Sequence, residues 1–289
     1  MKQVTLHDGH SIDIEVFGEG GPSLLLPVNT QIIEGIHADE MLKWGVAPAL
    51  GRSLVDGLRD SYRVIAFGYE GHVFKHAKPD TLTPANIAQD FLTIASAAGA
   101  DSFAYYGYSW LALSGMQLAI RTNRLTALIM GGFPPIAGPY KEMLAVTRAT
   151  HAMAMAPKQT SSKEFAADTW EGSTDDYDWS KVEVTMSPSQ TRQFVTLYEQ
   201  LQSFDDRAIQ PAITCPKLCF AGSADKIAYG PTWGDVLVDI TGPLLDRRHE
   251  LEANGWDVAV LEGLDHTQAM QAANVLPVLR PWLEKKLKS

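Results

Sequence analysis

The stretch Tyr105-Tyr106-Gly107-Tyr108-Ser109-Trp110 predicts a buried strand that turns directly into a helix. Residues 103–106 form an apolar run without alternation, which is typical of a strand covered on both faces. A helical pattern follows Ser109 and runs to Arg121. A serine at such a bend sits on a strained turn that exposes its hydroxyl above the sheet, and Gly107 lets the strand and the helix approach closely. Ser109 is therefore a candidate nucleophile.

The same residues allow a second interpretation of Ser109. Leu111 stands two places after the serine, where this kind of bend usually has another small residue, and Ala112 only partly compensates for it. On the short motif alone, Ser109 would simply cap the N-terminus of the helix, because motif matches are hypotheses. The two interpretations differ in whether the rest of the chain supplies a base and a carboxylate.

Buried-strand patterns recur on both sides of this stretch, with helical patterns between them. A hairpin is predicted at the start, where strand-like residues 3–6 and 12–16 flank the Asp8-Gly9 turn signal. The alternation predicts an α/β protein with a mostly parallel central sheet flanked by helices and the hairpin at one edge. The further strands are predicted at 23–26, 62–67, 125–130, 217–221 and 257–261, and helices follow Thr83-Pro84 and span Val275 to Lys286.

One long region breaks the alternation of strands and helices. Residues 134–206 contain no convincing buried strand and are rich in methionine and aromatic residues in helical stretches. We predict an inserted, mainly helical cap, or lid, over the carboxyl edge of the sheet, where open α/β sheets bind ligands. The predicted core domain then comprises residues 1–133 and 207–289. Within the cap, the acidic stretch 171–178 is expected to be an exposed loop.

Two later strand ends carry the groups that a serine nucleophile requires. A weak hydroxyl nucleophile needs a base, and the base needs a carboxylate that holds its tautomer. Asp225 follows the strand predicted at 217–221, and His266 follows the strand predicted at 257–261. Because the carboxyl ends of parallel strands meet at one edge, we predict a triad of Ser109, Asp225 and His266. Asp265 is a competing carboxylate, but a sequence neighbour cannot easily orient the imidazole ring.

On these residues the chain resembles the α/β-hydrolase-fold proteins that carry a helical cap, over nearly its whole length. The nucleophile elbow of that superfamily matches at Ser109, its acid at Asp225 and its base at His266. The Ser-Trp pair of the elbow is also similar to proline iminopeptidases, although their His-Gly-Gly-Pro stretch is missing here. The resemblance implies the α/β-hydrolase fold and a cofactor-independent serine hydrolase that forms an acyl-enzyme.

The chain departs from the superfamily after its third strand, where a His-Gly pair is usual. The corresponding stretch is Leu26-Pro27-Val28-Asn29-Thr30. A simple alignment implies that the backbone N–H groups of Asn29 and Trp110 form the oxyanion hole, with Thr30 as a substitute for Asn29. Pro27 has no N–H, and a positive φ at β-branched Val28 would be costly, so the turn must differ.

A second departure lies in residues 69–74, where the superfamily usually has an Arg-Gly-x-Gly-x-Ser turn. Here the stretch is Tyr69-Glu70-Gly71-His72-Val73-Phe74. His72 is expected to be a turn histidine that faces solvent rather than a substrate contact. None of the other histidines outside the triad shows the spacing of metal ligands, so no metal site is expected.

The predicted function is hydrolysis of an ester, thioester or related acyl bond in a small apolar substrate. Two alternatives stay open, since a fold does not fix a function. The same residues would serve a non-hydrolytic lyase, cyclase, C–C bond-cleaving or acyl-transfer enzyme. The altered oxyanion loop would also suit a ligand-binding pseudoenzyme with little turnover. The identity of the substrate is not encoded in any pattern that we recognise.

Composition excludes several other classes of protein. The 289 residues carry 24 Lys+Arg and 34 Asp+Glu, a net charge of −10, which argues against a nucleic-acid binder. The apolar runs fall short of the roughly 18 residues of a membrane span, and the start lacks the apolar core of a secretory signal. Two cysteines, Cys215 and Cys219, favour a reduced, cytoplasmic protein. We expect a small-molecule substrate and no cofactor, and a homo-oligomer stays open.

Overall fold

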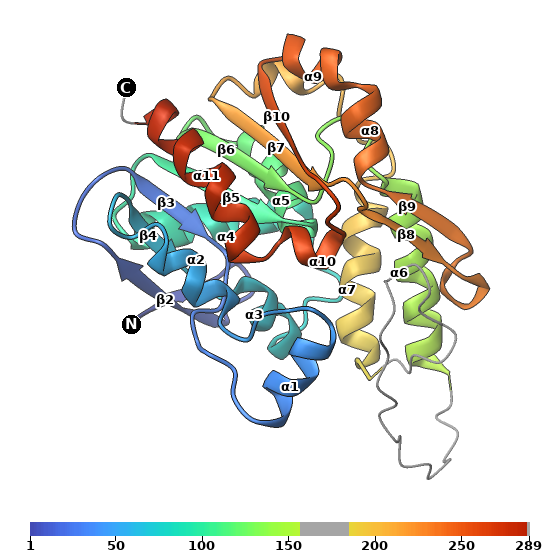
Figure 1. Cartoon of the computed structure of the whole chain (residues 1–289). Coiled ribbons are helices and arrows are strands. Elements are labelled where there is room, and N and C mark those ends of the chain that lie inside the picture. Colours follow the sequence, from blue (N-terminus) through green and yellow to red (C-terminus); the bar gives the residue numbers. More distant parts are fainter. Residues whose placement is uncertain (157–184, 288–289) are drawn as a thin grey trace.

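A single eight-stranded sheet runs through the described residues of the computed structural model, 1–156 and 185–287 (Figure 1). Across the sheet the order is β1 (Lys2–Thr5), β2 (Ser11–Phe17), β4 (Arg63–Ala66), β3 (Ser23–Leu26), β5 (Phe103–Tyr108), β6 (Leu125–Gly131), β7 (Lys217–Gly222) and β10 (Trp256–Leu261). The last six strands in this order pair in parallel, and β1 and β2 form an antiparallel hairpin at one edge. This confirms the predicted sheet and hairpin.

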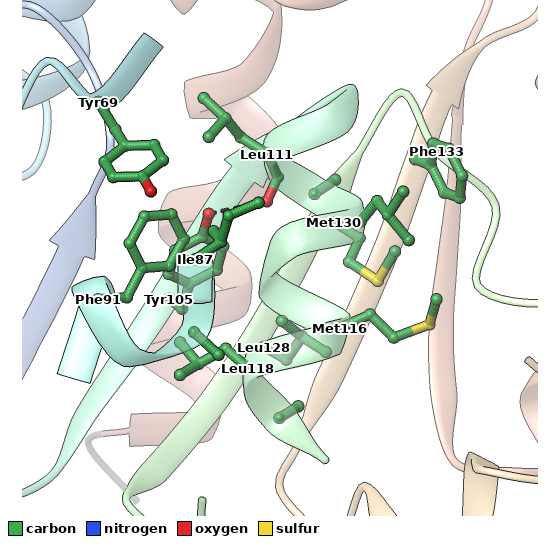
Figure 2. Close-up of a cluster of buried hydrophobic side chains, with 14 of the residues drawn as sticks. Tyr69, Ile87, Phe91, Tyr105, Leu111, Met116, Leu118, Leu128, Met130 and Phe133 are labelled. Carbon is green, nitrogen blue, oxygen red and sulfur yellow. Dashed lines mark hydrogen bonds between the residues drawn. The ribbon is translucent and has the colours of Figure 1, made fainter. Parts of the chain in front are cut away.

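The apolar runs of the central strands arise because both faces of the sheet are covered. Successive side chains of a strand point to opposite faces. Tyr105 of β5 accordingly lies in one buried cluster, whereas its neighbours Ala104 and Tyr106 lie in the other. Figure 2 shows the first cluster, in which Tyr105 packs beside Phe91. A strand of this kind has no polar face, and its sequence therefore shows no alternation.

Helices from different parts of the chain cover the two faces. The first cluster receives side chains from α4 (Pro84–Ala97) and α5 (Trp110–Ala119). The second receives side chains from α2 (Leu50–Asp56) and α11 (Ala272–Leu287). The start of α4 is as predicted, because the side chain of Thr83 accepts a hydrogen bond from Asn86 N at 3.2 Å.

The described residues between β6 and β7 include a pair of long helices. These are α6 (Tyr140–Met155) and α7 (Pro188–Glu199), which pack side by side (Figure 1). A capping box between Ser187 and Gln190 begins α7. The helical character predicted for the cap is thus confirmed, while the acidic stretch 171–178 lies outside the described residues. The division of the chain at residues 134 and 206 stays a prediction.

A buried polar network ties the cap to the core. Asp90 of α4 is fully buried and accepts a hydrogen bond of 2.7 Å from the hydroxyl of Tyr69. The ammonium of Lys78 lies 3.7 Å from Asp90 and 2.5 Å from Asp8, in the turn of the opening hairpin. The backbone N–H of Lys78 donates to Gln193 of α7 at 3.0 Å. Each of these charges has a partner, as buried charges require. The hydrogen bond from Lys78 joins α7 to this network.

None of the helices in the described ranges combines the length and the apolar character needed to cross a membrane.

The sequence did not predict several smaller elements. A two-stranded antiparallel sheet pairs β8 (Lys226–Tyr229) with β9 (Val236–Asp239). The remaining helices are α1 (Ile36–Lys43), α3 (Tyr69–Lys75), α8 (Thr241–Asp246), α9 (Arg248–Ala253), α10 (His266–Ala269) and the 3-10 helices η3 (Gln210–Ala212) and η4 (Pro231–Trp233).

The prediction that His72 faces solvent from a turn is wrong. His72 lies on α3, is 7% exposed and packs against the ring of Tyr69 at 6.3 Å. Its Nε2 atom is buried without a hydrogen-bond partner among the described residues. Burial, with a smaller effect from the charge of Lys78, lowers the pKa of His72 from 6.5 to about 4.

This lowered pKa predicts a specific loss of stability in acid. The unfolded chain takes up a proton at His72 below about pH 6.5, whereas the folded protein does so only near pH 4, so the free energy of unfolding falls between these values. Between pH 7 and pH 4.5, we expect the His72→Phe variant to lose about 2 kcal/mol less than the wild-type protein in urea unfolding. Equal losses in the two proteins would contradict the buried, neutral state of His72.

Candidate active site

Ser109 lies at a strained bend between β5 and α5. Its backbone has φ 56° and ψ −129°, which non-glycine residues rarely adopt. A side chain on Gly107 would place its Cβ 2.4 Å from the carbonyl oxygen of Leu111, so this position must be glycine. The Tyr105 hydroxyl donates to the same carbonyl at 2.7 Å and secures the bend. The Leu111 side chain packs in the first buried cluster, so the bend accommodates this large residue.

The interpretation of Ser109 as an N-cap alone does not agree with this geometry. Ser109 precedes the first residue of α5, but its side chain makes no capping hydrogen bond. An N-cap residue usually has an extended backbone, whereas the φ of Ser109 is positive. The bend instead leaves Ser109 lining a cavity that His266 also lines.

His266 is paired with a buried carboxylate. Its Nδ1 lies 2.9 Å from Oδ2 and 3.0 Å from Oδ1 of Asp225, which is fully buried at the end of β7. A carboxylate accepts from Nδ1–H, and this leaves Nε2 as the basic nitrogen of a neutral ring. The competing carboxylate of Asp265 instead caps α10, where it accepts from Gln268 N at 2.8 Å. Asp225 is therefore the partner of His266.

Backbone hydrogen bonds join the loop that carries Asp225 to the loop that carries His266. Ser223 N donates to the carbonyl of Leu261 at 2.9 Å, and Gly263 N donates to Ser223 Oγ at 2.7 Å. The carbonyl of Asp225 accepts from Ile240 N at 3.1 Å, just after β9. The residue that follows β9 thus holds the backbone of Asp225.

Tyr108 is a contact of His266 that the sequence analysis missed. Its hydroxyl donates to the backbone carbonyl of His266 at 2.8 Å, and the two rings lie 5.1 Å apart. Burial raises the pKa of the Tyr108 phenol, so the hydroxyl stays protonated and remains a donor. The only signal in the sequence was the place of Tyr108 immediately before the candidate nucleophile.

Ser109 and His266 both line a cavity of about 430 Å³, which we call the main cavity. Asn29 lines it, but Thr30 does not. Thr30 is buried, and its hydroxyl donates to Glu15 instead. Most of the remaining wall is apolar, and it is formed by Leu26, Pro27, Val28, Ile33, Met41, Val46, Leu50, Leu54, Leu111 and Met270.

Asn29 and Trp110, whose backbone N–H groups are the predicted oxyanion donors, line the cavity together with Ser109. Among the hydrogen bonds of the described residues, none uses the backbone N–H of Asn29 or Trp110 as its donor. Trp110 is the first residue of α5, whose N–H has no acceptor within the helix. Val28 does not adopt a positive φ, in agreement with the expected change of this turn.

Helix α2 presses directly against this loop. A Cβ on Gly51 would lie 1.9 Å from the carbonyl oxygen of Asn29 and 3.1 Å from Cβ of Val28. Because the carbonyl is part of the backbone, no side-chain rotation could relieve such a contact. The absence of a side chain at Gly51 therefore allows α2 and the Asn29 backbone to lie this close together.

The cysteines lie outside the cavity lining. Both are free thiols, and burial raises the pKa of each. Cys219 is buried in β7, and Cys215 precedes that strand. Within the described ranges, no group of three or more histidine, cysteine or acidic side chains could hold a metal ion.

The architecture matches solved structures, although the sequence matches no model of a protein family and no curated protein. A carboxylesterase structure from the thaumarchaeon Nitrososphaera gargenis superposes with a TM-score of 0.59 at 16% identity, over 96% of each chain. The chain has the α/β-hydrolase fold. The enol-lactonase of Burkholderia xenovorans has a TM-score of 0.57 and 17% identity, over 98% of this chain and 99% of that chain. An esterase of Thermogutta terrifontis shares this α/β-hydrolase fold, with a TM-score of 0.56 and 16% identity over 99% and 98%.

Proposed function

We propose that the protein is a serine hydrolase that cleaves an ester, thioester or related acyl bond of a small apolar substrate. The observation that carries the proposal is the contact of 2.9 Å between His266 Nδ1 and the buried carboxylate of Asp225, at a cavity that Ser109 also lines. A base that a carboxylate orients, in a cavity that a serine also lines, is the arrangement expected for activating serine. Esterases and a lactonase among the similar folds support the same reaction class.

The reaction proceeds in two steps. Ser109 Oγ attacks the acyl carbon while His266 Nε2 takes its proton, and the tetrahedral intermediate then expels the alcohol or thiol, which receives that proton. An acyl-enzyme remains on Ser109. Water attacks the ester carbonyl, again losing its proton to His266, and the acid leaves as Ser109 regains a proton. Asp225 holds the ring and stabilises the imidazolium, and it stays ionised throughout.

The backbone N–H groups of Asn29 and Trp110 bind the oxyanion that develops in both steps. Donors fixed before the reaction stabilise developing charge without having to reorganise. The loop at Asn29 lacks a glycine, and its position depends on the close packing of α2 at Gly51. In this chain, packing of a neighbouring helix replaces the conformational freedom that a glycine would give to the loop.

The dimensions of the main cavity indicate the size and polarity of the acyl compound. About 430 Å³ lies within the range of small-molecule sites. Apolar side chains from β3, α1, α2 and the loops between them form much of its wall, as expected for a site that binds an apolar chain. Short to medium aliphatic esters are therefore the appropriate first substrates.

Hydrolysis in oxygen-18 water tests the proposal directly. We expect the wild-type protein to convert aliphatic p-nitrophenyl esters to acids that contain one atom of oxygen-18, and Ser109→Ala to lose this activity. The Ser109→Ala protein also controls for spontaneous ester cleavage. An acyl product without the label would contradict hydrolysis, and turnover by folded Ser109→Ala at the wild-type rate would contradict the role of Ser109.

A further inference from the structure

A second cavity, of about 230 Å³, is lined by Ser109 and by residues of the inserted helices. It shares Ser109, Trp110 and Glu70 with the main cavity. A substrate that spans both cavities therefore has its reacting bond at Ser109, beside Glu70. The other lining residues come from α3, α6, α7 and the segment before α7, and they are Phe74, Met143, Thr147, Thr150, Met186, Thr191, Phe194 and Tyr198.

Aromatic rings form much of the wall of this second cavity. The rings of Trp110 and Phe194 meet edge to face at 5.5 Å, and those of Phe74 and Phe194 lie 5.7 Å apart. The indole Nε1–H of Trp110 donates to Oε1 of Glu70 at 2.8 Å. This hydrogen bond holds the carboxylate against the aromatic wall and beside the nucleophile.

The polar groups of α6 and α7, as far as the structure describes these helices, do not balance the charge of Glu70. The hydroxyls of Thr147 and Thr150 donate to carbonyls of their own helix, each at 2.8 Å. Arg148 and Arg192 lie on these helices, but both pair with Glu199, at 3.0 and 3.1 Å. Among the described residues, no lysine or arginine lines either cavity.

We propose that the second cavity binds an ammonium group of the substrate, which places a cation beside the reacting acyl bond. Aromatic faces attract a desolvated ammonium, and Glu70 supplies the opposite charge. The same carboxylate repels substrates that carry an anion at this position. The substrate class is then an acyl compound with an apolar acyl chain in the main cavity and an amino-alcohol or similar cationic leaving group in the second. This substrate assignment rests on the proposed function, whereas the cation site itself does not require turnover.

Three butyrate esters of matched shape test the proposal. The choline ester ends in a trimethylammonium group, the 3,3-dimethylbutyl ester is its neutral isostere, and the 2-sulfoethyl ester is anionic. Binding is measured by calorimetry to Ser109→Ala, so that no ester is consumed. We expect the choline ester to bind about tenfold more tightly than the neutral ester, and the anionic ester about tenfold more weakly, since Glu70 is partly screened by solvent.

The double variant Ser109→Ala/Glu70→Gln isolates the charge. Glutamine keeps an oxygen acceptor for Trp110 Nε1, and we expect the three dissociation constants to converge to within about threefold. Glu142→Gln in the Ser109→Ala background is the matched control, because Glu142 lies on α6 but lines neither cavity. This control should leave the charge preference unchanged.

Two results would overturn the cation site. One is equal binding of the choline and neutral esters by Ser109→Ala, and the other is a choline preference that is undiminished in Ser109→Ala/Glu70→Gln. The outcome is distinct from that of the proposed function. Charge-selective binding to a wild-type protein that hydrolyses no ester would overturn the hydrolase proposal and leave the cation site in place.

Discussion

Replacing His266 with alanine is expected to lower kcat for ester hydrolysis by about 10⁴- to 10⁶-fold, with little change in KM. The hydroxyl of Ser109 is a weak nucleophile at neutral pH, and His266 is the base that the buried carboxylate of Asp225 orients. Removing the imidazole leaves the cavity wall otherwise intact, so binding of the ester should persist. Steady-state kinetics with a soluble aliphatic ester measure the effect.

Non-additivity of the variants provides a sharper criterion. Ser109 and His266 act as a unit, so the double variant should lose no more activity than either single variant. His249→Ala is the matched control, because His249 is fully exposed on α9 and should retain wild-type kinetics. A folded His266→Ala protein that keeps kcat within about tenfold of wild type would contradict the proposed triad.

The second large effect is expected at Gly51, which lines the main cavity and packs against the backbone of Asn29. Gly51→Ala would place a methyl group 1.9 Å from the Asn29 carbonyl oxygen, and both groups belong to main-chain segments that must then separate. The displaced Asn29 N–H can no longer bind the oxyanion, and we expect kcat to fall by about 10²- to 10³-fold. KM should change less, because the donor acts mainly in the transition state.

A matched glycine variant separates this local effect from a general one. Gly20→Ala meets no atom within 4 Å and should leave kcat unchanged. Thermal unfolding of both variants establishes how much of each protein is folded under the assay conditions. If folded Gly51→Ala retained kcat within about twofold of wild type, the assignment of Asn29 as an oxyanion donor would be contradicted.

The sequence was most informative where one local pattern had one structural solution. An apolar run followed by Gly107 and Ser109 specified the strand, the bend and the helix, because few backbones join these elements so tightly. The apolar runs of the other central strands indicated strands that are covered on both faces, which is typical of a parallel sheet. Residues 69–74 show the opposite case. They form helix α3, and Tyr69 is held by tertiary contacts with Asp90 and Phe91 that no local pattern reveals.

The surroundings of the site were less predictable than its three central residues. The sequence left Asn29 and Thr30 as alternatives for the oxyanion donor. In the structure Asn29 lines the main cavity and Thr30 does not, and the Thr30 hydroxyl donates to Glu15. The hydrogen bond between Trp110 and Glu70 joins residues that are 40 positions apart in the sequence. The hydrogen bond between Tyr108 and His266 joins residues that are 158 positions apart. Such contacts depend on how separate elements pack, and single-sequence patterns carry no information about them.

Covalent trapping of the nucleophile measures the central claim most directly. The account predicts that an alkyl fluorophosphonate adds one phosphonyl group to the wild-type protein, and that peptide mass spectrometry places it on Ser109. Modification should be much slower in His266→Ala, and Ser109→Ala should stay unmodified at position 109. A folded wild-type protein that stays unmodified, or that is modified only at a residue outside the cavity, would contradict the account.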